Sequence, residues 1–295
     1  MRTLWPRWTL LPPAPFVLWS AYVLARGEAR WEAVLFLVGA PLLAYATPRT
    51  KRLFVGVYPV GLVGVLYDAM RFVKYVGVTP ERVHTCDLQA LDARVFGVTV
   101  EDRILSWCDI FRQHRSPFLD AYCAIPYGTF LLLVVGYAIY LFMREHRALK
   151  RFAWAYLVLN VAGFVTYHVV PAAPPWYVHA YGCVVNLAAP ASEGPKLAAV
   201  DAMIGVPYFA GFYGRSNDVF GALPSLHVAY PLLVVLEAWR LHGALGRALS
   251  IAFFVSMCFG AVYLDHHWVI DVVLGVLYGL GAHAIVSRWF KAEAP

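Results

Sequence analysis

Apolar segments long enough to cross a membrane recur along the whole sequence, and they limit the possible folds more than any other feature. A helix needs about 20 residues to cross about 30 Å of hydrocarbon. Apolar stretches of this kind cover residues 9–25, 31–47, 53–73, 118–143, 151–170, 225–241, 246–264 and 267–288. Because 61% of the 295 residues are hydrophobic and only 14% are charged, a water-soluble domain of this length could not bury its apolar side chains. The sequence therefore predicts an all-α, polytopic membrane bundle with eight candidate spans.

The first apolar stretch allows a second interpretation. It contains three prolines, follows Arg2 and Arg7, and includes the sequence "YVLA", which resembles a signal-peptidase site. Whether this stretch is retained in the mature protein is left open, and its removal would not change the orientation of the later spans. We expect N-terminal transmembrane helices over residues 1–52 and one membrane domain over residues 53–295.

Basic residues indicate which ends of the spans face the cytoplasm. The short connections at 48–52 and 144–151 are dense in Lys and Arg, and such clusters mark cytoplasmic loops. The two long connections, 74–117 and 171–224, and the turn around Asp265 then lie on the non-cytoplasmic side. This topology accounts for the formal net charge of +6, so nucleic acid is not expected as a partner.

Three of the five cysteines fall on the predicted non-cytoplasmic side. A disulfide is chemically permitted there. The positions of Cys86, Cys108 and Cys183 do not determine a pairing, and free thiols are an equal alternative.

Two histidines that are 40 residues apart in the sequence are predicted to meet at one face of the membrane. From His227 the chain crosses to about residue 241 and returns by about residue 264, so His227 and His267 lie at the same level on the non-cytoplasmic side. Asp271 follows His267 by four residues, so their side chains share a helix face. The carboxylate can accept a hydrogen bond from one imidazole nitrogen and leave the other free to attack. His266 is turned away and is given the lesser role.

Ser225 is predicted to cap the helix that carries His227. Its side chain suits the N-cap position, and the free N–H groups of the first helical turn form a seat for an anion. Pro231 lacks the N–H that would bind the carbonyl of His227, so we expect a bend near the mouth of the helix. An imidazole beside such a seat can give a proton to a departing oxygen.

A simpler interpretation exists for histidines near a membrane interface, which are often packing residues. We adopt it for four others: His84, His146, His242 and His283. For His227, His267 and Asp271 we favour function, because ionisable groups in apolar spans are costly and usually functional. A metal site built from these three residues would lack a fourth ligand at a suitable spacing, so no metal or other cofactor is predicted.

The sequences "PSLH" (224–227) and "HWVID" (267–271) resemble the second and third signature motifs of the type 2 phosphatidic acid phosphatase superfamily. The longer set "PPWYVHAYG", "GFYGRSNDVFGALPSLHVAYP" and "YLDHHWVIDVVLG" is similar to the inositol phosphorylceramide synthase family. The resemblance covers roughly residues 60–288 and implies a core of six helices, with active-site segments at 171–231 and 263–275.

The resemblance implies a phosphohistidine mechanism without a metal ion. His267 would attack phosphorus, Asp271 would orient it, and His227 would protonate the leaving alkoxide and then deprotonate the incoming hydroxyl. In that family the donor is phosphatidylinositol, the acceptor is a ceramide hydroxyl and the by-product is diacylglycerol. Lipids and the membrane are therefore the expected partners, while the oligomeric state and any accessory subunit stay open.

The phosphatases of the superfamily carry basic residues that this sequence lacks. Gly260 and Ala261 stand where those enzymes have a Ser-Arg pair, and no Lys-Arg cluster precedes "PSLH". A phosphodiester brings one negative charge and a monoester up to two, so fewer fixed cations favour a diester substrate. Arg215 is the first candidate to bind the phosphate, with Arg71 or Lys196 as alternatives.

Two other functions compete with transfer of a headgroup to a lipid hydroxyl. The same triad with water as the acceptor would make a lipid phosphatase or phosphodiesterase. A transporter or scaffold that retains an inactive fold is disfavoured, because all three triad positions hold competent residues. The identity of the headgroup depends on the resemblance alone.

Further polar residues are predicted at the depth of the triad. Asp68, Arg71, Asp120 and His168 lie near the non-cytoplasmic ends of their spans, as expected of a polar cavity. Contacts that only fix helix packing are an alternative for all four. Tyr177 could line a polyol headgroup, although a place in an ordinary aromatic belt is the competing interpretation.

The segment 99–114 is predicted to be an interfacial helix on the non-cytoplasmic surface. Thr99 and Asp102 resemble a capping box, and Ile104, Cys108 and Phe111 repeat at helical spacing with charged residues opposite. A plain connecting helix would show the same pattern.

Overall fold

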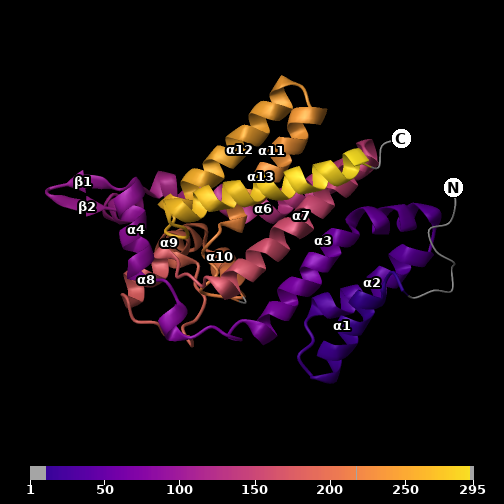
Figure 1. Ribbon diagram of the computed structural model, residues 1–295, viewed down its shortest axis with the longest axis horizontal. Helices are drawn as coiled ribbons and strands as arrows, with labels where there is room; N and C mark the ends of the chain where they lie inside the picture. Colours follow the sequence, from indigo (N-terminus) through magenta and orange to yellow (C-terminus); the bar gives the residue numbers. More distant parts are fainter. Residues whose placement is uncertain (1–10, 217, 293–295) are drawn as a thin grey trace.

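The computed structural model describes residues 11–216 and 218–292 as a predominantly helical chain (Figure 1). Arg2, Arg7 and the start of the first apolar stretch lie outside the described residues. In chain order the elements are α1 (Ala14–Ala25), α2 (Trp31–Tyr45), α3 (Pro48–Val73), the 3-10 helix η1 (Pro80–Arg82), α4 (Cys86–Phe96), β1 (Val98–Val100), β2 (Arg103–Leu105), α5 (Trp107–Gln113), α6 (Pro117–Arg144), α7 (His146–Val169), α8 (Pro175–Tyr181), α9 (Gly194–Ile204), α10 (Tyr208–Tyr213), α11 (Leu226–Leu241), α12 (Ala244–Tyr263) and α13 (Val269–Ala292).

Each of the eight predicted apolar stretches contains a helix. Five of these helices, α3, α6, α7, α12 and α13, are long and apolar enough to cross a membrane. The other three are shorter, with 12 residues in α1, 15 in α2 and 16 in α11. The prediction of an all-α, polytopic membrane protein is confirmed.

Six helices, α3, α6, α7, α11, α12 and α13, pack around one continuous apolar core. Helix α7 contacts α3, α11 and α13, and α11 also contacts α6 and α12. A Cβ added at Gly56 of α3 would lie 2.5 Å from Leu149 Cδ2 of α7, so this glycine permits a close approach of the two helices. Because lipid is as apolar as the core, such close packing holds the bundle together more than exclusion of water does.

The hairpin of α1 and α2 packs on α3, outside the six-helix bundle (Figure 1). A separate apolar cluster of Phe16, Ala40, Ala44 and Phe54 joins these three helices. The boundary between the N-terminal helices and the main membrane domain at residue 52 stays a prediction.

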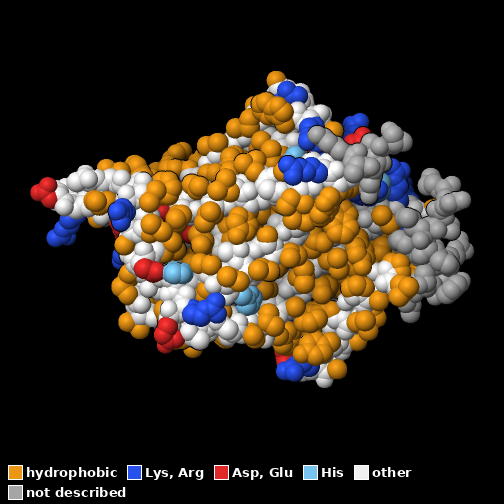
Figure 2. Space-filling model, in the orientation of Figure 1, with side chains coloured by type: hydrophobic (Ala, Val, Ile, Leu, Met, Phe, Trp, Pro, Cys, Tyr) orange, Lys and Arg blue, Asp and Glu red, His pale blue; other side chains and the backbone are white. Residues whose placement is uncertain are grey.

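The two ends of the bundle differ in their connections. Short turns join α2 to α3, α6 to α7 and α11 to α12 at one end, whereas α4, α5, α8, α9 and α10 gather at the other (Figure 1). Hydrophobic side chains cover most of the visible face between these ends (Figure 2). This surface is the one expected of a protein whose sides are in contact with lipid.

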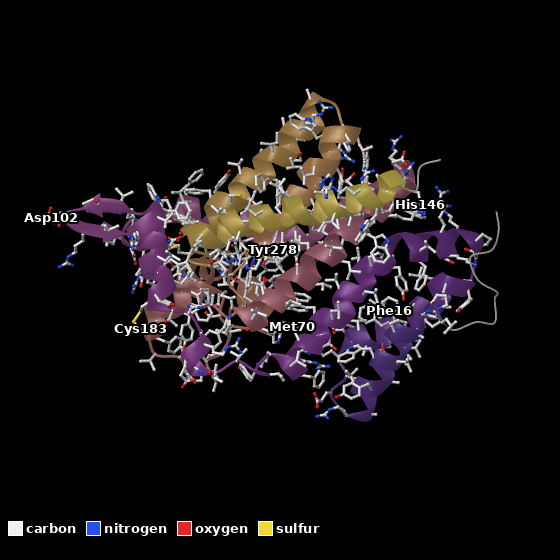
Figure 3. The ribbon with its side chains drawn as sticks, viewed as in Figure 1. Phe16, Met70, Asp102, His146, Cys183 and Tyr278 are labelled. Carbon is white, nitrogen blue, oxygen red and sulfur yellow. A yellow bond between two sulfur atoms is a disulfide. The ribbon has the colours of Figure 1, made fainter. Side chains whose placement is uncertain are left out.

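A disulfide joins Cys86, at the start of α4, to Cys183, which follows α8 (Figure 3). Cys108 is a buried free thiol. The structure thus decides the pairing that the sequence leaves open, and the bond lies at the end of the bundle that carries the long connections.

The predicted helix over 99–114 is wrong in its first half. Strands β1 and β2 form an antiparallel hairpin there, with Glu101 and Asp102 in its turn at φ values of 47° and 63°. Two positive φ angles are what a two-residue type I′ turn requires, and the β-branched residues of the segment favour strand. Helix α5 begins only at Trp107, and its capping box is Ser106 with Asp109.

Candidate active site

The structure brings His227 and His267 into direct contact. His227 lies in the first turn of α11, and His267 lies in the loop between α12 and α13. The distance between His227 Nδ1 and His267 Nε2 is 3.1 Å. The predicted meeting of the two histidines at one end of the bundle is confirmed.

His267 is held in a single orientation by the backbone. Its Nδ1 lies 2.9 Å from the carbonyl oxygen of Ala222. Because a carbonyl only accepts hydrogen bonds, Nδ1 carries the proton and Nε2 keeps its lone pair. The sequence predicts Asp271 as the acceptor, but its Oδ2 is 3.5 Å from Nδ1, which is long for a hydrogen bond. The structure gives the hydrogen bond to Ala222 and leaves Asp271 as a nearby carboxylate.

Ala222 itself is fixed by neighbouring backbone. Isolated parallel bridges join the segments around residues 84, 172 and 221. Ala222 N donates to Ala172 O at 3.2 Å, and the indole of Trp268 donates to Ala173 O at 3.1 Å. The carbonyl that orients His267 therefore belongs to a segment held by backbone hydrogen bonds to the segment around residue 172, which is in turn bonded to the segment around residue 84.

Asp271 links the start of α13 to the start of α11. Its Oδ2 accepts a hydrogen bond from Trp268 N at 2.9 Å, and its carbonyl accepts one from Ser225 N at 3.0 Å. A Cβ added at Gly275, one turn further along α13, would lie 2.3 Å from the carbonyl oxygen of Ser225. The starts of α11 and α13 therefore touch through their backbones.

Ser225 occupies the N-cap position of α11, but its side chain does not cap the helix. The residue is fully buried, and its Oγ has no hydrogen-bond partner among residues 11–216 and 218–292. The first N–H groups of a helix also lack partners within that helix. Because a buried polar group without a partner is costly, this corner is suited to a polar ligand such as a phosphate oxygen.

Aromatic rings enclose the histidine pair. The ring of His227 stacks on Tyr127, with centroids 5.1 Å apart, and meets Phe130 edge-on at 4.9 Å. His266 packs against Tyr127 at 5.0 Å and Tyr213 at 4.9 Å. The faces of aromatic rings therefore form much of the surroundings of His227 and His266.

Burial determines the charge of the loop histidines. It lowers the pKa of His267 to about 4, although the hydrogen bond with Ala222 acts in the opposite direction. Burial also lowers the pKa of His266 to about 4, against the hydrogen bond with the carbonyl of Glu193. Both rings are neutral near pH 7, so the lone pair of His267 Nε2 is available to attack an electrophile.

Of the residues predicted to bind the phosphate or headgroup, Ser225 lies at the start of the helix that carries His227, and no hydrogen bond joins Arg215, Lys196 or Tyr177 to either histidine among the described residues. Arg215 is exposed and takes part in none of the ion pairs within the described part of the chain. Lys196 is buried, with its ammonium donating to the carbonyl of Tyr263 and lying 4.2 Å from that ring. Tyr177 is buried as well, and its hydroxyl is bonded to the backbone of Val184 and Asn186.

The polar residues predicted at the depth of the triad make structural contacts. Asp68 pairs with Arg71 at 3.1 Å and accepts a hydrogen bond from Trp19 of α1 at 2.9 Å. Asp120 accepts from Tyr263 at 2.8 Å and from Arg115 at 2.9 Å. His168 is bonded to two backbone carbonyls, at 2.9 and 3.1 Å. These contacts fasten helices to one another, as in the packing alternative.

Sequence reasoning missed four polar residues in or beside the loop between α12 and α13: Asp92, Asp109, His179 and Asp265. Asp92 Oδ1 accepts a hydrogen bond from Ile270 N at 2.9 Å, so a residue of α4 caps α13. The ring of His179 bridges Asp109 and Asp265. No spacing in the sequence reveals this group, because its members come from separate elements that meet only in the folded chain.

The chemistry available at the site is that of nucleophile, acid and base. Among the residues that the structure describes, no group of three or more His, Cys, Asp or Glu side chains could hold a metal ion. The expectation of a reaction without a cofactor stays a prediction.

Comparison with known proteins gives one family and several relatives. Residues 93–285 match the model of the PAP2 superfamily. The chain is 33% identical over 265 residues to the phosphoinositol dihydroceramide synthase of Bacteroides thetaiotaomicron, covering 88% of this chain and 84% of that protein. It is 23% identical over 237 residues to the inositol phosphorylceramide synthase catalytic subunit of Schizosaccharomyces pombe, covering 79% of this chain and 54% of that protein. The corresponding subunit of Saccharomyces cerevisiae is 30% identical over 171 residues, with 57% and 42% covered.

The extent of these matches includes the site. The chain spans about half the length of the two fungal relatives and most of the bacterial one. No solved structure matches it. The family match covers α11, the loop between α12 and α13 and most of α13, and the chain belongs to the PAP2 superfamily.

Proposed function

We propose that this protein transfers a phosphoinositol headgroup from a glycerophospholipid to the hydroxyl group of a ceramide-type lipid. The bacterial relative is named a phosphoinositol dihydroceramide synthase, and the fungal relatives are named inositol phosphorylceramide synthases. The observation that carries the proposal is the contact between His227 Nδ1 and His267 Nε2. It places a group that can exchange protons directly beside a neutral nucleophile.

In the first step, His267 Nε2 attacks phosphorus and the glycerol oxygen leaves. The phosphate enters between the two imidazoles and replaces their mutual hydrogen bond, and its negative charge favours the protonated form of His227. As the N–P bond forms, the P–O bond to the glycerol breaks, and His227 gives its proton to the leaving oxygen. The products are diacylglycerol and a phosphoinositol group bound to His267.

In the second step, the lipid hydroxyl occupies the place of the diacylglycerol oxygen. Neutral His227 removes the hydroxyl proton while the oxygen attacks phosphorus. The N–P bond breaks and its electron pair returns to Nε2. Both histidines are then in their starting states, and the phosphodiester has moved to the new lipid.

Neighbouring groups stabilise the charges that develop. Attack by Nε2 leaves a positive charge on the ring of His267, and the Asp271 carboxylate lies 3.5 Å from its Nδ1. Ser225 Oγ and the start of α11 are placed to bind the non-bridging oxygens of the phosphate. These neighbouring groups, Asp271, Ser225 and the start of α11, include no arginine. Fewer fixed cations suit a phosphodiester, which carries one negative charge.

Burial favours a lipid acceptor over water. His267 is only 4% exposed, and aromatic rings cover His227. Exclusion of water slows hydrolysis of a reactive intermediate. A hydroxyl carried by a lipid can enter from the membrane without hydrating the site.

The proposed site faces the non-cytoplasmic side of the membrane. Arg49, Lys51 and Arg52 lie in the first turns of α3, and Arg144 and Arg147 flank the turn between α6 and α7. Such basic clusters mark the cytoplasmic end, and the histidines lie at the opposite end. The disulfide of Cys86 and Cys183 at the histidine end is consistent with an oxidising compartment.

The test uses the purified full-length protein and phosphatidylinositol labelled in its headgroup. With ceramide present, we expect label in the ceramide and free diacylglycerol, and a metal chelator should leave this activity intact. His267→Ala and His227→Ala should each lose turnover. His114→Ala is the matched control, because that histidine is exposed after α5 on the same side.

Each part of the proposal has its own contrary result. Release of inositol phosphate at the same rate without ceramide would identify a hydrolase instead of a transferase. Loss of activity in the chelator would rule out the metal-free mechanism. Full turnover in both histidine variants would remove the site assignment.

A further inference from the structure

A second site built around a histidine lies next to the loop between α12 and α13, which carries His267. His179 of α8 has its Nδ1 2.8 Å from Asp265 Oδ2 and its Nε2 2.9 Å from Asp109 Oδ1. The side chains of His179 and Asp265 are 8% and 5% exposed, and that of Asp109 is 20% exposed. The mechanism proposed above uses none of these three groups.

Asp265 is the residue through which this site reaches the reacting histidines. It immediately precedes His266 and His267, and its φ is +71°, a left-handed conformation that favours glycine. Its carbonyl accepts a hydrogen bond from Trp176 N at 2.8 Å. Helix α8 therefore makes two hydrogen bonds with Asp265: Trp176 N donates to its carbonyl, and the His179 ring bonds to its carboxylate.

The other end of the bridge is anchored in α5. Asp109 Oδ2 accepts hydrogen bonds from Ser106 Oγ at 2.6 Å and Ser106 N at 3.1 Å, and Gln89 of α4 donates to Asp109 Oδ1 at 3.1 Å. The thiol of Cys108 in the same helix lies 3.5 Å from the carbonyl oxygen of His267. The bridge thus runs from a capped helix to the loop that carries the nucleophile.

We propose that His179 is a positioning residue for the transfer reaction: by bonding to Asp109 and Asp265 at once, it holds the loop in the conformation that aims His267 Nε2 at phosphorus. This inference rests on the assignment of His267 as the nucleophile. His179 touches neither His227 nor His267 through any hydrogen bond that the structure shows within its described residues, so it acts through the backbone of Asp265.

Two ionised carboxylates within hydrogen-bond distance of both ring nitrogens favour an imidazolium at His179. Ionised carboxylates only accept hydrogen bonds, so both ring nitrogens then carry protons. Burial by itself would lower the pKa of His179, but the hydrogen bonds with Asp109 and Asp265 outweigh it and raise the pKa to about 9. The bridge is therefore complete at neutral pH.

The charged and titratable groups around the bridge come from several elements. Lys196 of α9 and His266 of the loop interact with Asp265. Asp92 of α4 interacts with Asp109, and Cys108 of α5 interacts with both carboxylates. Of the four groups named here, Lys196 is the cation at neutral pH, since burial lowers the pKa of His266 to about 4.

A pH effect follows from this arrangement. Above about pH 9, His179 loses one proton, and one of its two nitrogens then faces a carboxylate with no hydrogen between them. Asp265 or Asp109 is released, and the loop is free to leave the reactive conformation. We expect kcat to fall along an alkaline limb, while KM for the lipid donor changes little.

The experiment compares kcat, KM and pH profile for wild type, His179→Ala, Asp265→Gly and Asp109→Asn. His179→Ala and Asp265→Gly should each lower kcat by roughly 10- to 100-fold, with KM within about twofold of the wild-type value. Asp265→Gly keeps the backbone conformation, because glycine adopts positive φ freely. The double variant Asp265→Gly/His179→Ala should be no slower than either single one, since both remove the same bridge. Asp109→Asn removes one anionic acceptor and should move the alkaline limb at least one unit lower.

The outcomes separate this inference from the assignment of the nucleophile. If His267→Ala retains turnover, the active-site proposal fails. If His267→Ala is inactive while His179→Ala and Asp265→Gly keep wild-type kcat, or if their losses add in the double variant, the positioning role is wrong. An alkaline limb that does not move in Asp109→Asn also contradicts it. Should His179→Ala not fold, as judged by its melting temperature, the Asp265→Gly and Asp109→Asn measurements decide.

Discussion

At the scale of single residues, the reactivity of His267 depends on groups that surround it. The carbonyl of Ala222 fixes its tautomer at 2.9 Å, burial keeps it neutral by lowering its pKa to about 4, and His227 approaches its free nitrogen. In the proposed mechanism, the carboxylate of Asp271 stabilises the charge that forms after attack. Tautomer and charge stabilisation, which one carboxylate often provides together, are divided here between a carbonyl and an aspartate.

This division predicts the effect of Asp271→Asn. The substitution removes the negative charge but not the bond from His267 Nδ1 to Ala222, so the reactive tautomer should persist. We expect kcat to fall about 100-fold, less than the roughly 10⁴-fold loss typical when the wrong tautomer is also selected. Single-turnover rates of Asp271→Asn and His267→Ala would check this, and equal losses in the two variants would contradict it.

The bridge around His179 predicts how stability depends on pH. Its pKa is raised from 6.5 to about 9, so its stabilising contribution is complete below about pH 6.5 and is lost as the pH rises through about 9. The size of that contribution is on the order of 3 kcal/mol. Thermal unfolding in detergent between pH 6 and 10 should show a steeper decline for wild type than for His179→Gln, and parallel curves would be the contrary result.

At the scale of elements, the site depends on how closely α11 and α13 approach. A Cβ at Gly275 would come within 2.3 Å of a backbone atom of α11, and a backbone atom cannot move aside as a flexible side chain can. Asp92 of α4 caps the start of α13. A close backbone contact between α11 and α13 and a cap from a third helix therefore set the relative position of the two helices.

Gly275→Ala is expected to push α13 away from α11 and to lower kcat by at least tenfold, because small displacements of reacting groups are costly. Gly281→Ala is the matched control on the same helix, since a Cβ there would meet nothing within 4 Å. Activity and melting temperature of both variants would check this. Equal activity in the two variants would show that the close contact is not needed.

The disulfide is the second element-scale constraint, because it ties the start of α4 to the end of α8. Its cysteines are 97 residues apart in sequence, so a chain-entropy model gives a stabilisation of up to about 4–5 kcal/mol. We expect the Cys86→Ser/Cys183→Ser variant to melt at a lower temperature than wild type. Reduction of the wild type should lower its melting temperature in the same way, and reductant should leave the double variant unchanged.

At the scale of the whole molecule, the prediction concerns sidedness. The tip of the hairpin, Asp102, and the turn next to His146 lie at opposite ends (Figure 3). In a Cys258→Ser background, Asp102→Cys should react with an impermeant maleimide in intact cells, whereas Glu145→Cys should react only after permeabilisation. The reverse pattern would place the active site on the cytoplasmic side.

The sequence predicted the helices of the long apolar stretches correctly, but it did not predict the β1–β2 hairpin, whose fold depends on a two-residue turn. All eight apolar stretches contain helices, but 98–105 is a hairpin, because four β-branched residues and a Glu-Asp turn outweigh a helical spacing that only appears to continue into α5. For Asp68 and Asp120, the sequence predicts a depth in the membrane, and that depth stays a prediction. The sequence does not give their partners, Trp19 and Tyr263, which come from other helices.

The sequence by itself determined the membrane bundle, the level at which His227 and His267 lie, and the likeness of the two motifs, because these follow from hydropathy, the direction of successive crossings and residue identity. The tertiary structure decided the rest. It chose Ala222 over Asp271 as the acceptor for His267, paired Cys86 with Cys183, and assembled Asp109, His179 and Asp265 from three separate segments. Hydrogen bonds of this kind depend on distances of a few tenths of an ångström between distant parts of the chain, and no periodicity along a sequence encodes such distances.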